Sequence, residues 1–470
     1  MDMSTADKAP PGKVKVERRA WLVLIATAFG NFLVGLDTSI ANVAFPDMQA
    51  DFPSASRADL SWVLTFYAVT YAGLLIVAGR VADRVGRKRV FLLGLSLFVA
   101  ASLGVALAPS IAILVTLRGV QGLGAAAMIP ASLGLVIAAW PVERRTTAVA
   151  VWGSVLAISS SVGPTLGGLI IEFSSWRWAF LVNLPIGAFG LWWGRRILTE
   201  TERDRSAARP DVVGAVLITV AASGVALAIV QGGDWGWASI PVIGLLGLAV
   251  VSVGIVAWRT FGHTNPIVPK ALFSIPTFRI ASIAVFVFSL GFFSTFLTLV
   301  LFLTDIWQYS ALSAGLAITA LPVAASISAN VSGRVAERIG FRATIIPGCL
   351  LFAGGALWLW ARLGPEPDFV TGLLPATIMM GIGIGMAPAI LSAAGVASVT
   401  PAHFSVASAV GQMARQLGSA IGVAIVVAIL GGATSTDPAA ALASFDRAFL
   451  YLATVTALAG LITTQLRPAR

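Results

Sequence analysis

The sequence predicts an all-α membrane protein that crosses the bilayer many times. Of its 470 residues 57% are hydrophobic and only 11% are charged, and the mean hydropathy is +0.90. Apolar runs of about twenty residues recur along the whole chain, and this is the length that an α-helix needs to span the hydrocarbon core of a bilayer. These observations together predict a polytopic helical bundle.

The apolar segments, taken in order, number fourteen and are separated by charged or Pro/Gly-rich breaks. Residues 1–20 precede them and hold five Lys or Arg side chains without an apolar run, so we expect a basic tail rather than a cleaved signal peptide. The predicted spans are 21–45, 57–79, 90–108, 111–139, 148–171, 178–198, 211–231, 238–258, 278–303, 310–332, 343–361, 370–394, 404–430 and 446–466.

The distribution of charge supports this order of spans, because cytoplasmic loops of membrane proteins are enriched in Lys and Arg. With both termini in the cytoplasm, 25 of the 31 basic residues fall inside and 4 outside, whereas the acidic residues divide evenly, 10 to each side. The net charge of +10 therefore reflects topology. A nucleic-acid partner is disfavoured, since the basic residues are spread over short loops and tails and no basic soluble domain is present.

An internal repeat relates the two ends of the chain. The stretch "GRVADRVGRKR" at 79–89 returns as "GRVAERIGFR" at 333–342, and "PVERRTTAVA" after the fourth span is answered by "PAHFSVASAV" after the twelfth. Both copies lie in cytoplasmic loops, so we expect parallel repeats about an axis along the membrane normal, with a binding site where the halves meet near the midplane. The predicted domains are a cytoplasmic tail (1–20), an N-terminal six-helix bundle (21–198), a cytoplasmic linker (199–210), two additional transmembrane helices (211–259), a cytoplasmic loop (260–277) and a C-terminal six-helix bundle (278–467).

Composition also excludes several kinds of site. Cys349 is the only cysteine and His263 and His403 are the only histidines, so neither an internal disulfide nor a cysteine- or histidine-rich metal centre is expected. No GxxxxGK[ST] loop is present for ATP. We therefore expect no cofactor and no metal, and we disfavour an enzyme or a receptor because neither a catalytic constellation nor a ligand domain is found.

Charged residues inside predicted spans are functional candidates, because a charge in the membrane is costly unless it is paired or faces water. Away from the ends of the predicted spans, Asp37 is the only acid, and Arg118 and Arg415 are the only bases. The alternative for Asp37 is a structural acid that is hydrogen-bonded near Thr38 and Asn42, and that for Arg118 is an arginine that reaches toward the membrane face. For Arg415 a structural packing role is an equal alternative.

Two glycine-rich patterns suggest close backbone approach. In Gly79-x-x-x-Asp83-Arg84-x-Gly86 the glycines allow a tight turn, and Asp83 can pair with a neighbouring arginine, although the segment also fits an ordinary basic cytoplasmic loop. The fifth span repeats small residues at steps of three and four, which lets two helices approach closely. This face comprises Gly153, Ala157, Ser160, Gly163, Pro164, Gly167 and Gly168.

Taken together, "GLDTSIANVAFP", "GRVADRVGRKR", "LRGVQGLGAA", "GSVLAISSSVGPTLGGLI" and "WRWAFLVNLPIG" resemble the major facilitator superfamily, and within it the fourteen-span drug:proton antiporters. The resemblance covers the chain from Trp21 to about Arg467. It implies that Asp37 is the coupling acid and that Arg118 takes part in proton handling. It further implies that the small-residue face of the fifth span seals the seam between the halves. By the same resemblance, a conformational latch is formed by Gly79, Asp83, Arg84, Gly86, Arg87, Glu337 and Arg338.

The predicted function is proton-driven export of amphipathic or lipophilic small molecules, including drugs, antibiotics and cationic compounds. An exporter of one endogenous metabolite or lipid would share every motif, and a proton symporter is disfavoured by the fifth span. The expected partners are the substrate, protons and the lipid bilayer, with a monomer compatible with the sequence. Residues considered for the substrate cavity, although the aromatic ones also fit plain packing, are Asn42, Trp62, Phe66, Gln121, Met128, Phe292, Phe296 and Arg415.

Overall fold

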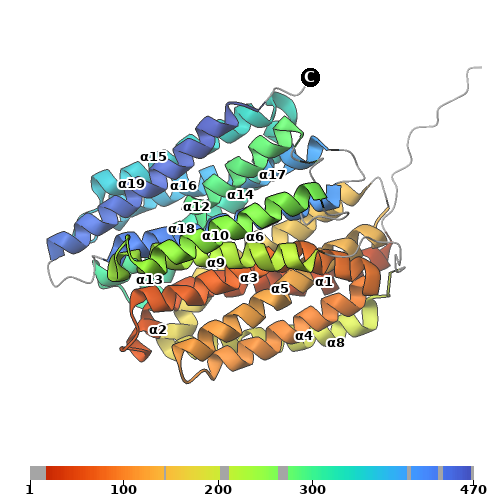
Figure 1. The fold of residues 1–470 in the computed structure, drawn as a ribbon, viewed down its shortest axis with the longest axis horizontal. Helices are drawn as coiled ribbons and strands as arrows, with labels where there is room; N and C mark the ends of the chain where they lie inside the picture. Colours follow the sequence, from red (N-terminus) through yellow and green to blue (C-terminus); the bar gives the residue numbers. More distant parts are fainter. Residues whose placement is uncertain are drawn as a thin grey trace, which may run out of the picture.

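The computed structural model describes residues 17–141, 144–201, 211–262, 272, 274–399, 404–431 and 438–466. Most of the predicted tail, of the linker 199–210 and of the loop 260–277 lies outside these residues. All regular elements in the described ranges are helices, as Figure 1 shows. They are α1 (Arg18–Val43), α2 (Phe45–Asp51), α3 (Arg57–Val85), α4 (Arg87–Ala106), α5 (Ile111–Ala139), α6 (Arg145–Phe173), α7 (Trp176–Leu181), α8 (Asn183–Ile197), α9 (Val212–Trp235), α10 (Ile240–Gly262), α12 (Pro276–Asp305), α13 (Ala311–Ile318), α14 (Ala320–Ile339), α15 (Phe341–Arg362), a π-helix (Phe369–Leu373), α16 (Leu374–Met386), α17 (Pro388–Ala397), α18 (Phe404–Leu430) and α19 (Pro438–Thr463).

Three predicted spans are divided in two, and each division lies beside a proline. A proline cannot donate a backbone hydrogen bond to the carbonyl four residues earlier, so a helix tends to end near that carbonyl. Pro185 follows the end of α7 by four residues, Pro322 follows the end of α13 by four residues, and Pro388 is the first residue of α17. The sixth, tenth and twelfth predicted spans are therefore each built from successive helices.

Among the described residues, twelve helical segments are long and apolar enough to cross a membrane. The helix α6 and the pair α7 and α8 occupy the positions of the other two predicted spans, the fifth and the sixth. The protein is thus a multi-pass helical membrane protein, and the count of fourteen crossings stays a prediction.

The predicted repeat is visible in the backbone at two glycines. Gly86 joins α3 to α4 with φ of 121°, and Gly340 joins α14 to α15 with φ of 92°. Positive φ is accessible to glycine without the steric cost that a side chain brings. The two copies of the glycine-rich stretch therefore form the same sharp connection between successive helices, which confirms the predicted turn.

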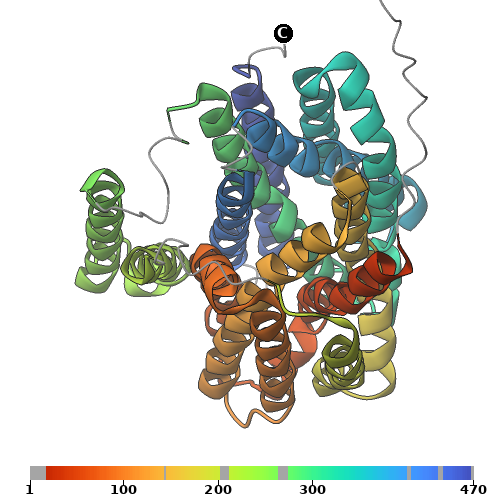
Figure 2. The same cartoon turned by 90° about the vertical axis from the view of Figure 1, so that its right-hand side faces the viewer.

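The helices pack in two groups that face one another (Figures 1 and 2). One group contains α1 to α8 and the other contains α12 to α19. They meet along two main seams: α3 packs against α18 on one side of the molecule, and α6 packs against α13 and α14 on the other. In the first seam the second span of the N-terminal half meets the fifth span of the C-terminal half. In the second seam the fifth span of the N-terminal half meets the second span of the C-terminal half, as a two-fold relation requires.

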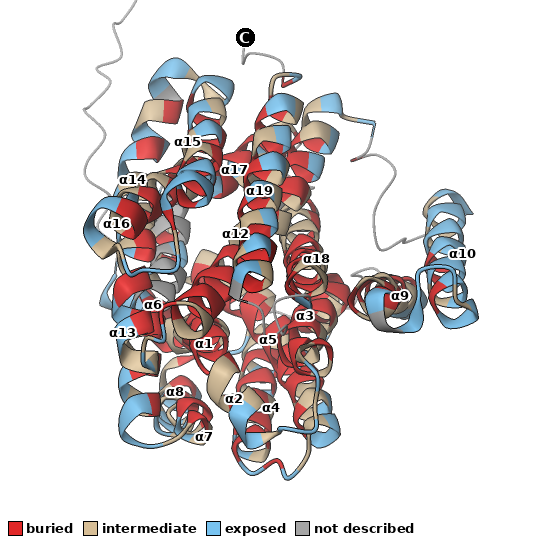
Figure 3. Ribbon diagram, turned by 90° about the vertical axis from the view of Figure 1, so that its left-hand side faces the viewer, coloured by how far each residue is buried: buried red, intermediate tan, exposed pale blue. Residues whose placement is uncertain are grey.

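The pair α9 and α10 stands apart from both groups. In Figure 2 these green helices project from the side of the molecule, and Figure 3 shows that most residues of α10 are exposed. The helix α9 packs against α3 and α18, whereas the main neighbour of α10 is α9. The exposed side chains of α10 are large and apolar, among them Ile240, Val250 and Trp258, as expected for a surface that faces lipid.

The α6 seam is tight at the predicted outer end. There Thr165 of α6 and Thr319, between α13 and α14, share a hydrogen bond of 2.6 Å across the halves. Away from this seam, at the same predicted outer end, Arg57 of α3 forms an ion pair with Asp305 of α12. Toward the predicted cytoplasmic end, by contrast, a Cβ added at Gly153 or at Gly333 would have no neighbour within 4 Å. The structure therefore represents a state that is closed toward the predicted outside along this seam.

The outer end of the N-terminal group is tied together by polar contacts of Asp51 in the short helix α2. Trp176 donates its indole N–H to the Asp51 carboxylate at 2.9 Å, and Arg177 forms an ion pair with the same oxygen. The hydrogen bond from Arg177, helped by that from Trp176, lowers the pKa of Asp51. This contact joins the α1–α3 connection to the start of α7.

Candidate functional site

The two charges of the N-terminal spans form one buried ion pair. Arg118 of α5 contacts Asp37 of α1 with 2.5 Å between Nη1 and Oδ2, and each residue is only 1% exposed. The sequence marked both residues as intramembrane charges, and the structure brings them together. Because each charge neutralises the other, the cost of burying either one is reduced.

Amide and hydroxyl groups complete the surroundings of Asp37. Gln121 and Asn183 donate to Asp37 Oδ1 at 2.8 and 3.0 Å, and both amides also contact Ser102 Oγ, at 2.8 and 2.9 Å. The carboxylate therefore accepts three hydrogen bonds, one of them from a cation. Such a set of donors holds the carboxylate in a single orientation.

The Arg118 guanidinium is fixed on its other sides as well. Its Nε donates to the carbonyl of Val63 in α3 at 2.9 Å, and Nη1 also donates to Gln121 Oε1 at 2.6 Å. The Tyr67 ring lies 4.4 Å from the guanidinium carbon and the Phe180 ring 5.5 Å from it, both within range of a cation–π interaction. We call Asp37, Ser102, Arg118, Gln121 and Asn183 the polar cluster.

A small chamber separates the polar cluster from the C-terminal half. Its volume is about 30 Å³, which is room for a water molecule and little more. A drug-sized molecule can occupy this place only if the two groups of helices move apart. The chamber is lined by Thr38, Asn42, Leu64, Tyr67, Ala68 and Arg118 from the N-terminal half and by Phe293, Gln416, Ser419, Ala420 and Val423 from the C-terminal half.

Arg118 belongs both to the polar cluster and to the wall of the chamber, so the ion pair lies next to the place where the halves meet. One further polar atom on the chamber wall, Asn42 Oδ1, is buried without a hydrogen-bond partner. Unsatisfied buried polar atoms are uncommon in proteins and often mark a functional site.

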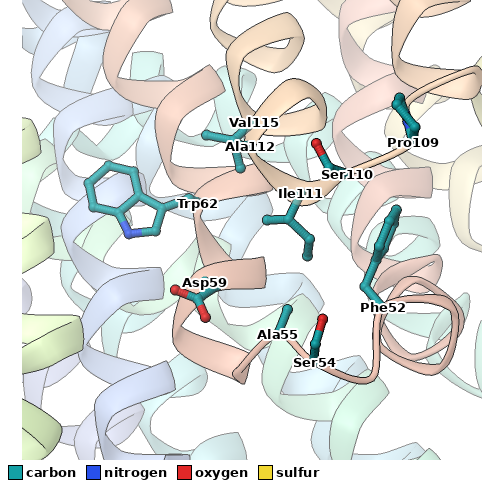
Figure 4. A pocket seen from close by; sticks show the side chains of 10 residues that line it. All are labelled: Phe52, Ser54, Ala55, Asp59, Trp62, Pro109, Ser110, Ile111, Ala112 and Val115. Carbon is teal, nitrogen blue, oxygen red and sulfur yellow. The ribbon is translucent and has the colours of Figure 1, made fainter.

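A larger hollow of about 500 Å³ lies at the predicted outer end of the N-terminal half. Figure 4 shows the side chains that line it. It is formed by the connection from α2 to α3 and the connection from α4 to α5, all within the N-terminal half, and Asp59 and Trp62 of α3 lie on its wall. Because this hollow does not touch the opposite half, its position does not suit an alternating-access site.

Of the residues predicted for the substrate cavity, Asn42 lines the chamber and most others lie elsewhere. Gln121 belongs to the polar cluster, Trp62 lines the outer hollow, and Met128 is fully buried within the N-terminal half. The ring of Phe66 lies against Gly119 of α5. These residues were chosen by type and approximate depth, which do not determine the face of the helix on which each one lies.

In α12, too, the predicted residues lie on a different face of the helix from the one that lines the chamber. We predicted Phe292 and Phe296 for the cavity, but the chamber is lined by Phe293. The Phe292 ring instead packs 6.1 Å from the Phe296 ring, measured between centroids. Since α12 carries apolar side chains all round, its sequence gives no amphipathic pattern from which to choose the face.

The predicted latch is connected to the N-terminal half alone. Arg87 contacts Asp83 at 2.9 Å and donates to the carbonyl of Gly134 in α5 at 3.1 Å. Glu200 accepts the backbone N–H groups of Lys88 and Arg89 at the start of α4. No contact of these side chains with the C-terminal half occurs within the described ranges, so a latch between halves is not formed in this state.

The remaining residues of the predicted latch form few contacts in the described part of the chain. Gly79 faces Pro130 of α5, with 3.4 Å between the position of an added Cβ and Pro130 Cβ. Arg84 and Arg338 form no ion pair in the part of the chain that the structure describes, and the side chain of Glu337 lies outside it.

The small-residue face of α6 serves two different contacts. A Cβ at Gly163 or Gly167 would meet Ser39 or Ile40 of α1, so these two glycines pack within the N-terminal half. A Cβ at Gly168 would lie 2.6 Å from the carbonyl oxygen of Ala311 in α13.

Pro164 completes this close contact between the halves, since a Cβ at Gly315 would lie 2.3 Å from its carbonyl oxygen. Pro164 and Gly168 thus lie where the two halves meet, and the sealing role of this face stays a prediction. The predicted position between the halves is wrong for Gly163 and Gly167, because successive small residues on one helix face different neighbours. Gly153 faces open space, and the side chains of Ala157 and Ser160 lie outside the described residues.

Sequence reasoning missed Ser102 and Asn183, which are fully buried in the polar cluster. Each is a polar residue in an otherwise apolar span, and Asn183 belongs to the quoted motif "WRWAFLVNLPIG". A search for polar side chains in spans, extended from charged to neutral residues, would have selected both.

Comparison with known proteins agrees with this architecture. The family described as Major Facilitator Superfamily matches residues 27–423. The chain is 33% identical to the methylenomycin A resistance protein of Streptomyces coelicolor, over 95% of this chain and 93% of that protein. It is also 33% identical to the multidrug resistance protein Stp of Mycobacterium tuberculosis, over 88% of this chain and 76% of that protein.

Among solved structures, an auto-inhibited peptide transporter of the POT family superposes with a TM-score of 0.67 at 15% sequence identity, covering 97% of this chain and 99% of that one. At this level of identity the match supports the fold alone.

Proposed function

The chain belongs to the major facilitator superfamily, and from this premise we propose that it is a proton-coupled exporter of amphipathic or lipophilic small molecules, drugs among them. Relatives named for resistance to methylenomycin A, to several drugs and to puromycin support drug export as the activity. A family of transporters also accounts for a chain in which we find no catalytic constellation.

The observation that carries the proposal is the buried pair of Asp37 and Arg118 on the wall of the chamber. A carboxylate is the group in this cluster that can gain and lose a proton, because an arginine stays protonated in proteins. Proton binding by Asp37 removes the negative charge that neutralises Arg118. The charge at the chamber wall therefore changes by one unit each time Asp37 takes up or releases a proton.

This exchange of charge would couple proton and substrate movement. With Asp37 ionised, Arg118 is held against it and the chamber wall is neutral. With Asp37 protonated, Arg118 loses its counter-charge, and breaking a buried pair by removing one partner costs about 3 to 5 kcal/mol. A cost of this size is sufficient to favour a different arrangement of the two halves.

The proton gradient provides enough free energy for export. One elementary charge that crosses a potential of about 100 mV releases about 2.3 kcal/mol, and each tenfold concentration ratio costs about 1.4 kcal/mol. One proton can therefore support roughly a fifty-fold gradient of a neutral substrate, and the proposed transport cycle requires neither a cofactor nor ATP.

For the cellular setting we propose the cytoplasmic membrane, with fourteen crossings and both termini in the cytoplasm. The excess of basic residues in the predicted inner loops supports this orientation. The outer ion pair of Arg57 with Asp305 and the tight outer end of the α6 seam would then close the route to the exterior.

The test is transport by the full-length protein in proteoliposomes with an imposed pH gradient and a chemically varied panel of compounds. We expect accumulation of several compounds against their gradients, and we expect a protonophore to abolish it. Uphill transport of a single compound out of a broad panel would identify a dedicated exporter. Transport that ignores the pH gradient would contradict proton coupling.

A further inference from the structure

Arg415 is the third charge that lies away from the ends of the predicted spans, and the proposed coupling does not use it. It lies near the middle of α18, and its Nε atom is buried without a hydrogen-bond partner. Arg57, Arg118 and Arg259 each contact a carboxylate. Arg415 has no such contact among the described residues.

The neighbours of Arg415 relate it to the chamber. Gln416 and Ser419 of the same helix line the chamber, and Ser419 is four residues from Arg415, so the two lie on one face of α18 about 6 Å apart along its axis. Gln416 and Ser419 are each 7% exposed. Arg415 is therefore one helical turn from the chamber wall, on the side of the predicted cytoplasmic end.

On the N-terminal side of the chamber, α3 also carries a polar residue one helical turn nearer the predicted cytoplasmic end. Tyr67 of α3 lines the chamber, and Tyr71, one turn nearer the predicted cytoplasmic end, has its ring centroid 6.1 Å from that of Tyr67. Tyr71 lies on α3 and Arg415 on α18, and these two helices pack against one another. Arg415 and Tyr71 are thus hydrogen-bond donors on two helices that pack together, each one helical turn from a residue that lines the chamber, on the side of the predicted cytoplasmic end.

The summed charge of Asp37, Arg118 and Arg415 is +1. Asp37 and Arg118 neutralise one another, and no other carboxylate pairs with Arg415 in the part of the chain that the structure describes. A cation inside a membrane protein is costly and marks a substrate or ion pathway by default.

We propose that Arg415, with Tyr71, recognises a carboxylate on the substrate, so that the preferred substrates are amphipathic acids rather than lipophilic cations. This inference rests on the proposed function, because it names the substrate class of the same transport pathway. A guanidinium binds a carboxylate through two parallel N–H groups, and the phenol of Tyr71 can donate a third hydrogen bond. Phe293 on the facing wall of the chamber supplies an apolar surface for the rest of such a molecule.

The experiment compares an aromatic acid with its neutral ester. Binding of 2-naphthoate, of its methyl ester and of the cation tetraphenylphosphonium is measured on the purified full-length protein in nanodiscs. We expect wild-type protein to bind the acid at least tenfold more tightly than the ester. We expect Arg415→Gln to weaken binding of the acid at least tenfold and to leave the ester within twofold, whereas Arg415→Lys keeps most of the preference.

The matched control is Arg362→Gln, which removes a cation from the exposed end of α15, where it stacks on Trp358. This variant should bind all three compounds as wild type does. A second variant, Ser419→Asp, tests the proposal even if Arg415→Gln fails to fold. It keeps the Arg415 side chain in place and adds a carboxylate one turn away that would neutralise it. It should abolish the preference for the acid.

The proposal is overturned if wild-type protein fails to bind the acid or prefers the ester or the cation. It is also overturned if both Arg415→Gln and Ser419→Asp retain the preference. Transport of the same compounds under a pH gradient separates this inference from the proposed function. A preference for the acid without proton-driven transport would contradict only the function, and proton-driven transport without that preference would contradict only the role of Arg415.

Discussion

Replacing Gly168 by alanine should open the outer end of the transporter. The added Cβ would lie 2.6 Å from the carbonyl oxygen of Ala311 and 2.9 Å from Leu312 Cα. Both neighbours are backbone atoms of α13, which cannot turn aside as a flexible side chain could. The helices α6 and α13 must therefore separate, and the closed outer end loses stability.

The size of the effect follows from the cost of overpacking. Inserting a methyl group into a closely packed contact costs about 1 to 3 kcal/mol. The cost applies to the state in which the outer end is closed, so the ratio of outward-open to closed molecules should rise about 5-fold to 150-fold. Gly153→Ala on the same helix is the matched control, because its added Cβ meets nothing within 4 Å while its gain in helix propensity is the same.

Accessibility of a cysteine at the seam measures this shift. Cys349 is first replaced by serine, and Thr319→Cys then reports on the seam, since Thr319 contacts Thr165 there. A membrane-impermeant maleimide added from the outside should label the Gly168→Ala variant about tenfold faster than the Gly153→Ala variant. Equal labelling rates in the two variants would refute the assignment of this contact as the outer closure.

Three further predictions concern topology, the latch and the outer ion pair. Tags at the C-terminus and within residues 199–210 should both report as cytoplasmic, and opposite sides would contradict the fourteen-span order. Asp83→Asn should slow transport while expression stays normal, because its ion pair with Arg87 is partly exposed and contributes only about 0 to 1 kcal/mol to stability; normal efflux would reduce the stretch to a topology signal. In a double-mutant cycle on outer accessibility, Arg57→Gln and Asp305→Asn should couple by about 0.5 to 3 kcal/mol, and additive effects would show that the pair does not hold the outer end closed.

The backbone architecture was accessible from the sequence because its signals are local. Runs of apolar residues of spanning length predicted the helices, and the repeated glycine at positions 86 and 340 predicted the sharp turn that the positive φ values confirm. The proline-linked divisions were not predicted, although Pro185, Pro322 and Pro388 are visible in the sequence. Their effect could have been read from the loss of one backbone donor.

The site was accessible only in part, because side-chain contacts depend on how helices pack. Asp37 and Arg118 were found singly, as charges in apolar spans, but 81 residues separate them and nothing local indicates that they touch. Phe293, which lines the chamber, was not among the predicted cavity residues for a related reason. Adjacent residues on a helix are rotated by about 100°, and a helix that is apolar all round does not reveal which of its faces meets the chamber.

Neighbouring glycines show the same limit. Gly167 and Gly168 are adjacent and of the same residue type. Gly167 nevertheless packs against α1 in its own half, whereas Gly168 packs against α13 in the opposite half. The sequence therefore predicts that α6 approaches another helix closely, and the tertiary structure decides which one.

The central claim is that Asp37 exchanges the coupled proton. In proteoliposomes, Asp37→Asn should retain exchange of labelled for unlabelled substrate, which requires no net proton movement, and should lose uphill accumulation driven by a pH gradient. Asp37→Glu should keep some uphill transport with an altered pH profile. The control Glu366→Gln, at an exposed acid of the loop after α15, should behave as wild type. Uphill accumulation by Asp37→Asn at a rate near that of wild type would contradict the account.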